Sequence, residues 1–345
     1  MGRELLKAAE VENIAKANTV QELELDGRKS SGGTPPPGRA ETPFRFSGHQ
    51  TFPLRITWIP KAVAEISAGR DPLTDIDQGI TQLGLGKNMV EALRCWIEAF
   101  QIARRAEQGW QLTPIGSLVF DPTDGLDRYF EDVSTAWLLH WLISTNTESP
   151  FFAWECLFNR WPSTEFSASQ VIAAFQKETS KTPRPASPVT VRQHWEVFLH
   201  SYRRPLADKG EDHLDSAMSV LRLIQQFGER PNASGKWETV YSFAMGRKRA
   251  IPEQLFGFFL HDWWNRKYPN ERTTPLREIV LGEHSPGRLL KMQESEVIQR
   301  VTDLAARQSK VFQIVESTNL RQLHRLQKSD GLDDLKAAYR TPRFI

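Results

Sequence analysis

The sequence contains little cysteine and no long hydrophobic run. Its two cysteines, Cys95 and Cys156, are far apart and form no C-x-x-C pair, which excludes a disulfide framework or a zinc knuckle. A membrane helix needs about 18 consecutive apolar residues. Neither such a run nor the apolar segment of a signal peptide is present. We therefore expect a cytoplasmic protein without a membrane partner.

Familiar catalytic signatures are also missing. The sequence has no P-loop, no G-x-G-x-x-G or G-x-S-x-G segment and no H-E-x-x-H or H-N-H motif. The residues taken alone therefore favour a binding protein over an enzyme.

Net charge says little about a nucleic-acid partner, but its distribution is informative. The formal net charge is only +2. Between Lys181 and Arg272, however, Lys and Arg outnumber Asp and Glu. Clustered basic side chains favour contacts with DNA phosphates. The residues of this stretch that we predict to bind DNA are Arg203, Arg204, Arg247, Lys248 and Arg249.

A helical pattern rich in aromatic residues dominates the chain. Eleven Trp and 19 Phe predict an aromatic core, and apolar residues recur mostly at helical spacing, so we expect a mainly α fold with minor β. A helix over 135–144, apolar almost all round and capped by Asp132 or Ser134, should be deeply buried. The predicted parts are a disordered Gly/Pro/Ser-rich extension at 1–43, a winged helix-turn-helix domain at 44–122, a helical domain at 123–272 and a C-terminal α+β or winged unit at 273–345.

Residues 72–119 show the element order of a winged helix-turn-helix. A first helix ends at Gly84-Leu85-Gly86, a second is predicted from Lys87 to Gln101, and a polar hairpin at 104–111 precedes a short helix. On the second helix, Lys87, Asn88 and Arg94 suit contacts with phosphates and base edges. Because Glu91 and Glu98 on the same helix do not, a protein–protein module is the alternative.

The segment His49-Gln50-Thr51 is a candidate site next to Gly48. Glycine lets a backbone approach a ligand closely, and histidine can shuttle a proton near neutral pH. The alternative is a turn in which His49 and Thr51 satisfy local backbone groups.

The remaining candidate residues are three carboxylates and two histidines. Asp124, Asp127 and Glu131 share one face if their segment is helical. Three such carboxylates could hold Mg²⁺, or they could be the solvated start of a helix. His140 and His261, the latter followed by Asp262, lie in apolar helical patterns and are interpreted as core histidines.

Three stretches resemble the SspB-like family of bacterial single-strand DNA phosphorothioation systems, once known only as a domain of unknown function. The resemblance covers 44–146 most closely, and the position of Gln50 is often Glu in the family pattern, so Gln50 cannot serve here as an anionic metal ligand. The stretches are Phe46-Ser47-Gly48-His49-Gln50-Thr51-Phe52-Pro53-Leu54-Arg55 with Trp58 and Lys61, Gly84-Leu85-Gly86-Lys87-Asn88-Met89-Val90 with Arg94 and Trp96, and Glu131-Asp132 with Thr135 and Trp137-Leu138-Leu139-His140-Trp141.

The resemblance implies a DNA-nicking subunit that works beside a cysteine desulfurase, an ATPase and an ATP pyrophosphatase. No catalytic assignment transfers from it. We hypothesise that His49 transfers a proton, that Arg55 clamps the scissile phosphate, and that Glu131 and Asp132 are the carboxylates available to a metal such as Mg²⁺, whose ligands are unknown. The alternative function is a non-catalytic winged-helix DNA-binding adaptor or transcriptional regulator.

Overall fold

The computed structural model describes residues 44–203, 216–317 and 320–345. They belong to one compact unit that begins at Thr42. Residues 1–43, for which we predicted disorder, lie outside these ranges, as does Arg204. The predicted class is confirmed, because the described residues are mostly helical with small antiparallel sheets. No helix in these ranges is long and apolar enough to cross a membrane.

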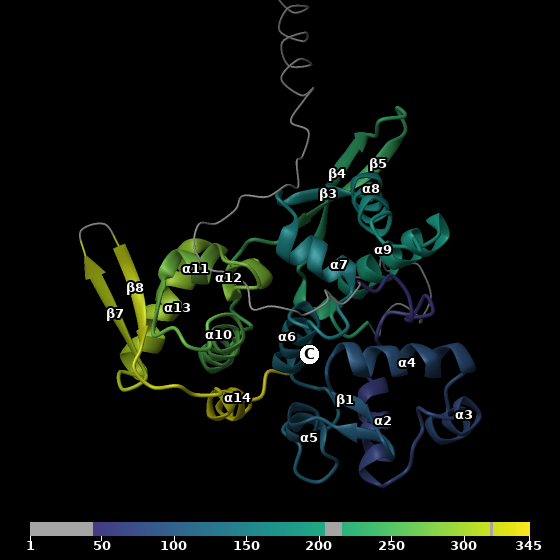
Figure 1. The fold of residues 1–345 in the computed structure, drawn as a ribbon, viewed down its shortest axis with the longest axis horizontal. Helices are drawn as coiled ribbons and strands as arrows, with labels where there is room; N and C mark the ends of the chain where they lie inside the picture. The colour runs from purple at the N-terminus through teal and green to yellow at the C-terminus, as the bar shows by residue number, and fades with distance from the viewer. Residues whose placement is uncertain (1–43, 204–215, 318–319) are drawn as a thin grey trace, which may run out of the picture. The chain divides into compact units, whose positions relative to one another are not determined.

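The helices and the hairpin predicted between residues 72 and 119 are present, and we call residues 58–120 the first winged unit (Figure 1). The Asp75 carboxylate accepts the backbone N–H of Asp77 at 2.9 Å and starts α3. Gly84 ends α3 in the left-handed conformation, with a φ of 64°. The elements are α2 (Trp58–Ser67), α3 (Ile76–Leu83), α4 (Lys87–Ala99), β1 (Ala103–Ala106), β2 (Gly109–Leu112) and α5 (Pro114–Phe120).

Residues 152–243 form a second winged unit, with a strand order of β3-β5-β4. Its three-stranded sheet lies within 123–272, which we predicted as a helical domain. Strand β4 was hard to predict because Ile224 is its single buried residue, so the alternation of a half-buried strand is weak. The elements are α7 (Phe152–Trp154), a π-helix η1 (Glu155–Arg160), β3 (Glu165–Ser167), α8 (Ala168–Thr179), α9 (Pro188–Tyr202), a 3-10 turn η3 (Ser219–Leu221), β4 (Ile224–Pro231) and β5 (Trp237–Phe243).

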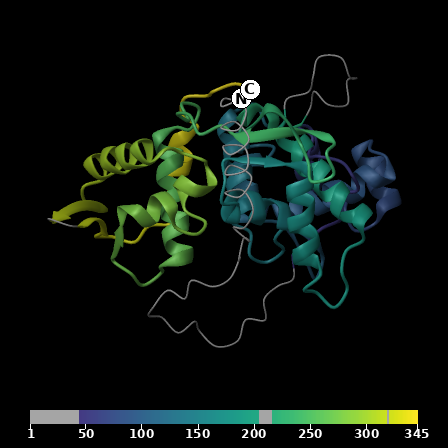
Figure 2. The same cartoon turned by 90° about the horizontal axis from the view of Figure 1, so that it is seen from above.

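The same order recurs at 253–325, the third winged unit, where the strands lie in the order β6-β8-β7. This unit is the green-to-yellow part of Figures 1 and 2. Helix α10 lies N-terminal to the boundary predicted at residue 273, yet it packs against α12, α13 and α14. The elements are α10 (Glu253–Lys267), β6 (Thr273–Pro275), α11 (Leu276–Leu281), α12 (Pro286–Leu289), α13 (Glu294–Arg307), β7 (Phe312–Ser317), β8 (Leu320–Arg325) and the following α14 (Leu332–Ala338).

Helix α6 (Val133–Ser144) is buried at every residue, as its apolar sequence predicts. Asp132 caps it by accepting the backbone N–H of Ser134 at 2.7 Å, which confirms one of the two predicted caps. Side chains of α6 belong to the same hydrophobic core as those of all three winged units. The core therefore holds the winged units together through apolar burial.

Candidate nucleic-acid interface

Helix α4 presents a narrow solvent face, concentrated at its N-terminal end. Lys87 and Asn88 are exposed, whereas Arg94 is half-buried. The opposite face is anchored in the core by fully buried residues such as Val90 and Trp96. Of the three DNA-binding residues predicted here, Lys87 and Asn88 are therefore the better placed to reach a DNA groove.

The hairpin β1–β2 adds two arginines that our sequence interpretation did not assign to DNA. Arg104 and Arg105 are exposed on β1, opposite Gln111 and Trp110 of β2. Trp110 is buried and fixes the hairpin on the unit. Adjacent arginines in a predicted wing were the available signal, since wings commonly contact the DNA backbone beside a recognition helix.

The motif at 48–52 forms a tight turn with left-handed backbone. The N–H of Phe52 donates to the carbonyl of His49 at 2.8 Å, and the two intervening residues, Gln50 and Thr51, have φ values of 47° and 66°. Positive φ at both central positions is typical of a type I′ turn, which usually contains Asn or Gly. The Trp96 indole N–H donates to the Phe52 carbonyl at 3.0 Å and ties the turn to α4.

His49 is buried beside His194 of the second winged unit. Its side chain is 2% exposed, and its Nε2 lies 3.2 Å from Nδ1 of His194. The N–H of Ala153 donates to Nε2 of His194 at 3.0 Å, so a neutral His194 carries its proton on Nδ1 and donates it to His49. His49 then carries its own proton on Nδ1, which has no partner among the described residues.

The surroundings of His49 keep its ring neutral. Burial, and to a smaller extent the positive charge of Arg45, lowers the pKa of His49 to about 4. Burial also holds the pKa of His194 well below the ordinary value for histidine. The predicted proton shuttle would need a ring that DNA can reach, whereas the structure encloses His49 among His194, Trp96 and Phe151.

Arg55 lies at the other end of the motif and is half-buried. Its guanidinium lies 5.8 Å from the centre of the Trp58 ring, and its backbone forms a β-bridge with Ser216. The motif is therefore tied to the segment before β4 as well as to α4.

The acidic segment at 121–132 corrects the prediction of a helical face. It consists of turns, so Asp124, Asp127 and Glu131 are not aligned along a helix. The Asp127 carboxylate accepts the backbone N–H groups of Glu131 at 2.7 Å and Asp132 at 3.0 Å. Asp127 therefore shapes the turn before α6.

Asp132 likewise serves the backbone. One carboxylate oxygen caps α6, and the other accepts the N–H of Arg343 at 2.9 Å. The N–H of Ile345 donates to the Glu131 carbonyl at 2.9 Å, which fastens the C-terminal tail alongside. Across the described ranges, no group of three or more His, Cys, Asp and Glu side chains could hold a metal ion.

The two basic triplets are only partly on the surface. Arg203 is half-buried at the end of α9, while Arg247 and Arg249 are exposed. Lys248 points inward, where its ammonium donates to the Ala244 carbonyl and burial lowers the pKa of this group to about 8. Lys248 is therefore poorly placed to bind a phosphate.

The remaining histidines occupy the core, as interpreted from sequence. His140 is fully buried and bonds the Tyr202 hydroxyl at 2.7 Å and the Leu289 carbonyl at 3.0 Å. His261 is 2% exposed, and its neighbour Asp262 accepts the indole N–H of Trp141 at 2.7 Å.

The hairpin β4–β5 was not predicted as a site. Figure 1 shows it extending past β3. Trp237 is 71% exposed, and Phe227, the extra residue at a β-bulge, is 63% exposed. Of the basic residues on the same hairpin, Lys236 is exposed, whereas Arg230 is half-buried and donates to the Gln170 side chain. Exposed aromatic and basic side chains together are typical of surfaces that bind nucleic acid.

Comparison with known proteins agrees with this architecture. Two solved structures share the fold, one described as SspB and the other as magnesium ion-bound SspB, each with a TM-score of 0.73. They are 23% and 22% identical to this chain, and each match covers 85% of this chain and 88% of the other. No curated protein sequence matches significantly. The model of a family described as "Protein of unknown function (DUF4007)" matches residues 46–339, and the chain therefore belongs to the DUF4007 family.

Proposed function

We propose that the protein binds double-stranded DNA through its first winged unit. The observation that carries this proposal is that one unit presents Lys87 and Asn88 at the start of α4 and Arg104 and Arg105 on its wing, all four exposed. In winged helices the first residues of the recognition helix contact base edges, and basic wing residues contact phosphates.

The alternative of a protein–protein module was based on the negative charges of Glu91 and Glu98, and the structure weakens the argument for Glu98. Its carboxylate pairs with the Arg45 guanidinium at 3.0 Å, so its charge is partly compensated within the protein. Glu91 is half-buried. Glu91, one turn after Lys87, is therefore the acidic side chain of α4 that remains near Lys87 and Asn88, and it is the stronger argument for a protein–protein module.

We further propose that the β4–β5 hairpin makes a separate contact with DNA. Trp237 and Lys236 lie together at the start of β5, where an aromatic ring can pack against a sugar or a base while the ammonium binds a phosphate.

The finer proposal is that the protein nicks the bound strand as a subunit of a DNA phosphorothioation system. Its support is the fold shared with SspB, together with the motifs around His49, Lys87 and Asp132. In such a system an ATPase and an ATP pyrophosphatase would be its partners. One of the similar SspB structures is described as magnesium ion-bound, but the described residues suggest no ligand set here, and we assign none.

The catalytic roles of His49, Arg55, Glu131 and Asp132 stay predictions. His49 and Asp132 are buried and bonded within the protein, which favours positioning roles for both. Arg55 is half-buried and Glu131 is exposed, so these two are the better candidates for contact with DNA. The same observation gives weight to the alternative of a non-catalytic adaptor or transcriptional regulator.

Relaxation of a supercoiled plasmid separates the two functions. A nicking subunit converts the plasmid to the open circle, and Arg55→Ala lowers that rate while duplex binding persists. An adaptor binds the same plasmid without relaxing it, with or without Mg²⁺. Persistent supercoiling under both conditions would contradict the nicking proposal but leave the proposal of DNA binding intact.

A further inference from the structure

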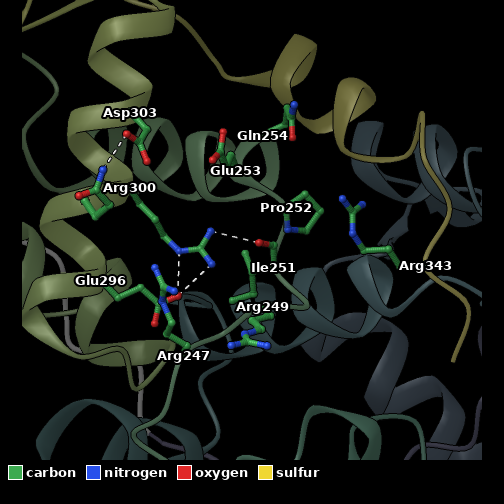
Figure 3. A pocket seen from close by; sticks show the side chains of 11 residues that line it. Arg247, Arg249, Ile251, Pro252, Glu253, Gln254, Glu296, Arg300, Asp303 and Arg343 are labelled. Atoms are coloured by element: carbon green, nitrogen blue, oxygen red, sulfur yellow. Dashed lines mark hydrogen bonds and ion pairs between the residues drawn. The ribbon is translucent and has the colours of Figure 1, made fainter.

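A pocket of about 460 Å³ opens between the loop before α10, helix α13 and the C-terminal tail. Figure 3 shows it at close range. Arg247, Arg249 and Arg343 line it, and they come from segments far apart in the sequence. Its volume is within the range of about 300–1,000 Å³ that is usual for small-molecule sites.

A buried ion pair fixes the loop that carries two of these arginines. On α13, Glu296 and Arg300 lie one turn apart and form a salt bridge of 2.9 Å. The Glu296 carboxylate accepts the N–H of Lys248 at 3.0 Å, and Arg300 donates to the Lys248 carbonyl at 2.8 Å. Arg300 also donates to the Ile251 carbonyl at 3.1 Å (Figure 3). Both backbone polar groups of Lys248, its N–H and its carbonyl, are therefore hydrogen-bonded to side chains of α13.

This clamp determines which side chains point outward. Lys248 is buried, so its neighbours Arg247 and Arg249 are left exposed beside the pocket. Because the loop is fixed, these two guanidiniums lose little conformational freedom of the backbone when they bind a ligand.

The charges of the pocket leave guanidinium groups uncompensated. Glu296 neutralises Arg300, and Glu253 pairs with Arg307 at 3.2 Å. Within the described ranges, no hydrogen-bond or carboxylate partner is found for the side chains of Arg247 and Arg249. The third arginine, Arg343, donates only to carbonyl oxygens, including that of Thr341 at 3.0 Å.

Two further features affect the binding of an anion: a carboxylate disfavours it, and the N-terminus of a helix favours it. Asp303 lines the pocket without a cationic partner among the described residues, although the Gln299 amide donates to it at 2.9 Å. Helix α10 begins at the pocket after Pro252, which provides no side-chain cap. The N–H groups of its first turn add positive potential. The whole lining has four guanidiniums and three carboxylates, and the three guanidiniums without a carboxylate partner among the described residues, those of Arg247, Arg249 and Arg343, favour an anion.

We propose that this pocket binds a phosphate group, carried either by a DNA strand or by a small phosphate-containing ligand. Guanidinium groups match phosphate because their paired N–H donors fit two phosphate oxygens. The pocket shares no residue with the first winged unit, so this proposal does not depend on DNA binding by that unit.

The test is titration of the full-length protein with inorganic pyrophosphate by calorimetry at constant ionic strength. The variant Arg247→Ala/Arg249→Ala should bind at least about tenfold more weakly, because hydrogen bonds to charged groups are removed. Arg272→Ala/Arg277→Ala removes two exposed arginines elsewhere in the third winged unit and should bind as the wild type does. Arg247→Lys/Arg249→Lys, which keeps the charge without the paired donors, should fall in between.

Two single-stranded oligonucleotides, with and without a 5′-phosphate, identify the source of the phosphate. If the alanine variant loses affinity for both, the pocket holds the backbone of a strand, and if it loses affinity only for the phosphorylated one, the pocket holds a strand end. A loss confined to pyrophosphate assigns the pocket to a small ligand. The proposal is overturned if the alanine variant binds all three probes as tightly as the Arg272→Ala/Arg277→Ala control does, or if the wild type binds none.

A variant of the first winged unit, Lys87→Ala/Arg104→Ala/Arg105→Ala, distinguishes the phosphate pocket from the proposed DNA-binding function. It should bind pyrophosphate normally even if its affinity for duplex DNA falls. Equal loss of pyrophosphate affinity in this variant and in the pocket variant would overturn the phosphate pocket.

Discussion

The rings of His49 and His194 are nearly coplanar and meet edge to edge, with 5° between their planes, 5.4 Å between their centroids and 3.2 Å between the hydrogen-bonded nitrogens. His49 lies in the segment that leads into the first winged unit, and His194 lies in the second winged unit. In sequence, 145 positions separate them. The family motif around His49 therefore connects the turn before α2 with helix α9. This hydrogen bond between two rings explains why a histidine is useful there without assigning it to chemistry.

Replacing His49 should destabilise the protein. The variant His49→Ala removes a buried ring that packs against Trp96, Phe151 and His194, and truncation of a buried aromatic side chain costs about 3 kcal/mol. Urea unfolding measures this loss. Thr51→Ala, at the exposed neighbouring turn, is the control and should cost far less. An unchanged unfolding midpoint in His49→Ala would show that the ring does not support the fold.

The same residue predicts a pH dependence of stability. Folding lowers the pKa of His49 from 6.5 to about 4, so the unfolded chain binds the proton more readily below pH 6.5. The contribution of His49 to the free energy of unfolding should therefore fall by about 3 kcal/mol as the pH drops from about 6.5 toward 4, and His194, whose pKa burial also lowers, adds to the decline. His49→Gln should flatten this decline between pH 7.5 and 5 in thermal melts. A decline of wild-type steepness in the variant would contradict the assignment to His49.

Asp132→Ala should destabilise the protein because it removes hydrogen bonds to two separate segments. The carboxylate caps α6 and also holds the N–H of Arg343, and loss of a helix cap alone costs about 1 kcal/mol. Asp124→Ala, which removes an exposed carboxylate from the same acidic segment, should have little effect. Chemical denaturation of the two variants compares them directly. Equal stabilities would mean that Asp132 is free for another role.

Trp237→Ala should weaken duplex DNA binding severalfold without changing the melting temperature. The ring is 71% exposed, and truncation of exposed residues usually shifts stability by less than about 0.5 kcal/mol. Phe344→Ala, at a ring that is 78% exposed on the C-terminal tail, is the matched control. Fluorescence anisotropy with a labelled duplex measures both. Equal affinities of the two variants would remove the β4–β5 wing from the interface.

Local features of the fold were predictable from sequence, whereas packing between distant segments was not. The stripe of Val90, Leu93 and Ile97 placed α4 correctly because an apolar helical face repeats over a few residues. The cap at Asp132 was equally local. The hydrogen bond between His49 and His194 depends on two segments brought together by folding, and no short sequence pattern predicts it.

The surface charges show the same limit. Arg247, Lys248 and Arg249 look alike in sequence, but the ion pair between Glu296 and Arg300 binds the loop backbone, and Lys248 is buried between its two exposed neighbours. Arg104 and Arg105 can be read from the sequence, but their assignment to DNA binding depended on the structure, in which Trp110 anchors their hairpin. Sequence therefore identified the basic segments, and the structure selected the side chains within them.

The central claim is that the first winged unit binds the DNA backbone, and the salt dependence of duplex binding tests it most directly. Each phosphate that a variant no longer neutralises should lower the slope of log K against log salt concentration by roughly one unit. Lys87→Ala/Arg104→Ala/Arg105→Ala should therefore reduce the slope by about three units, while the charge-matched control Lys177→Ala/Arg272→Ala/Arg277→Ala keeps the wild-type slope. A slope unchanged in the first variant, or reduced equally in both, would contradict the claim.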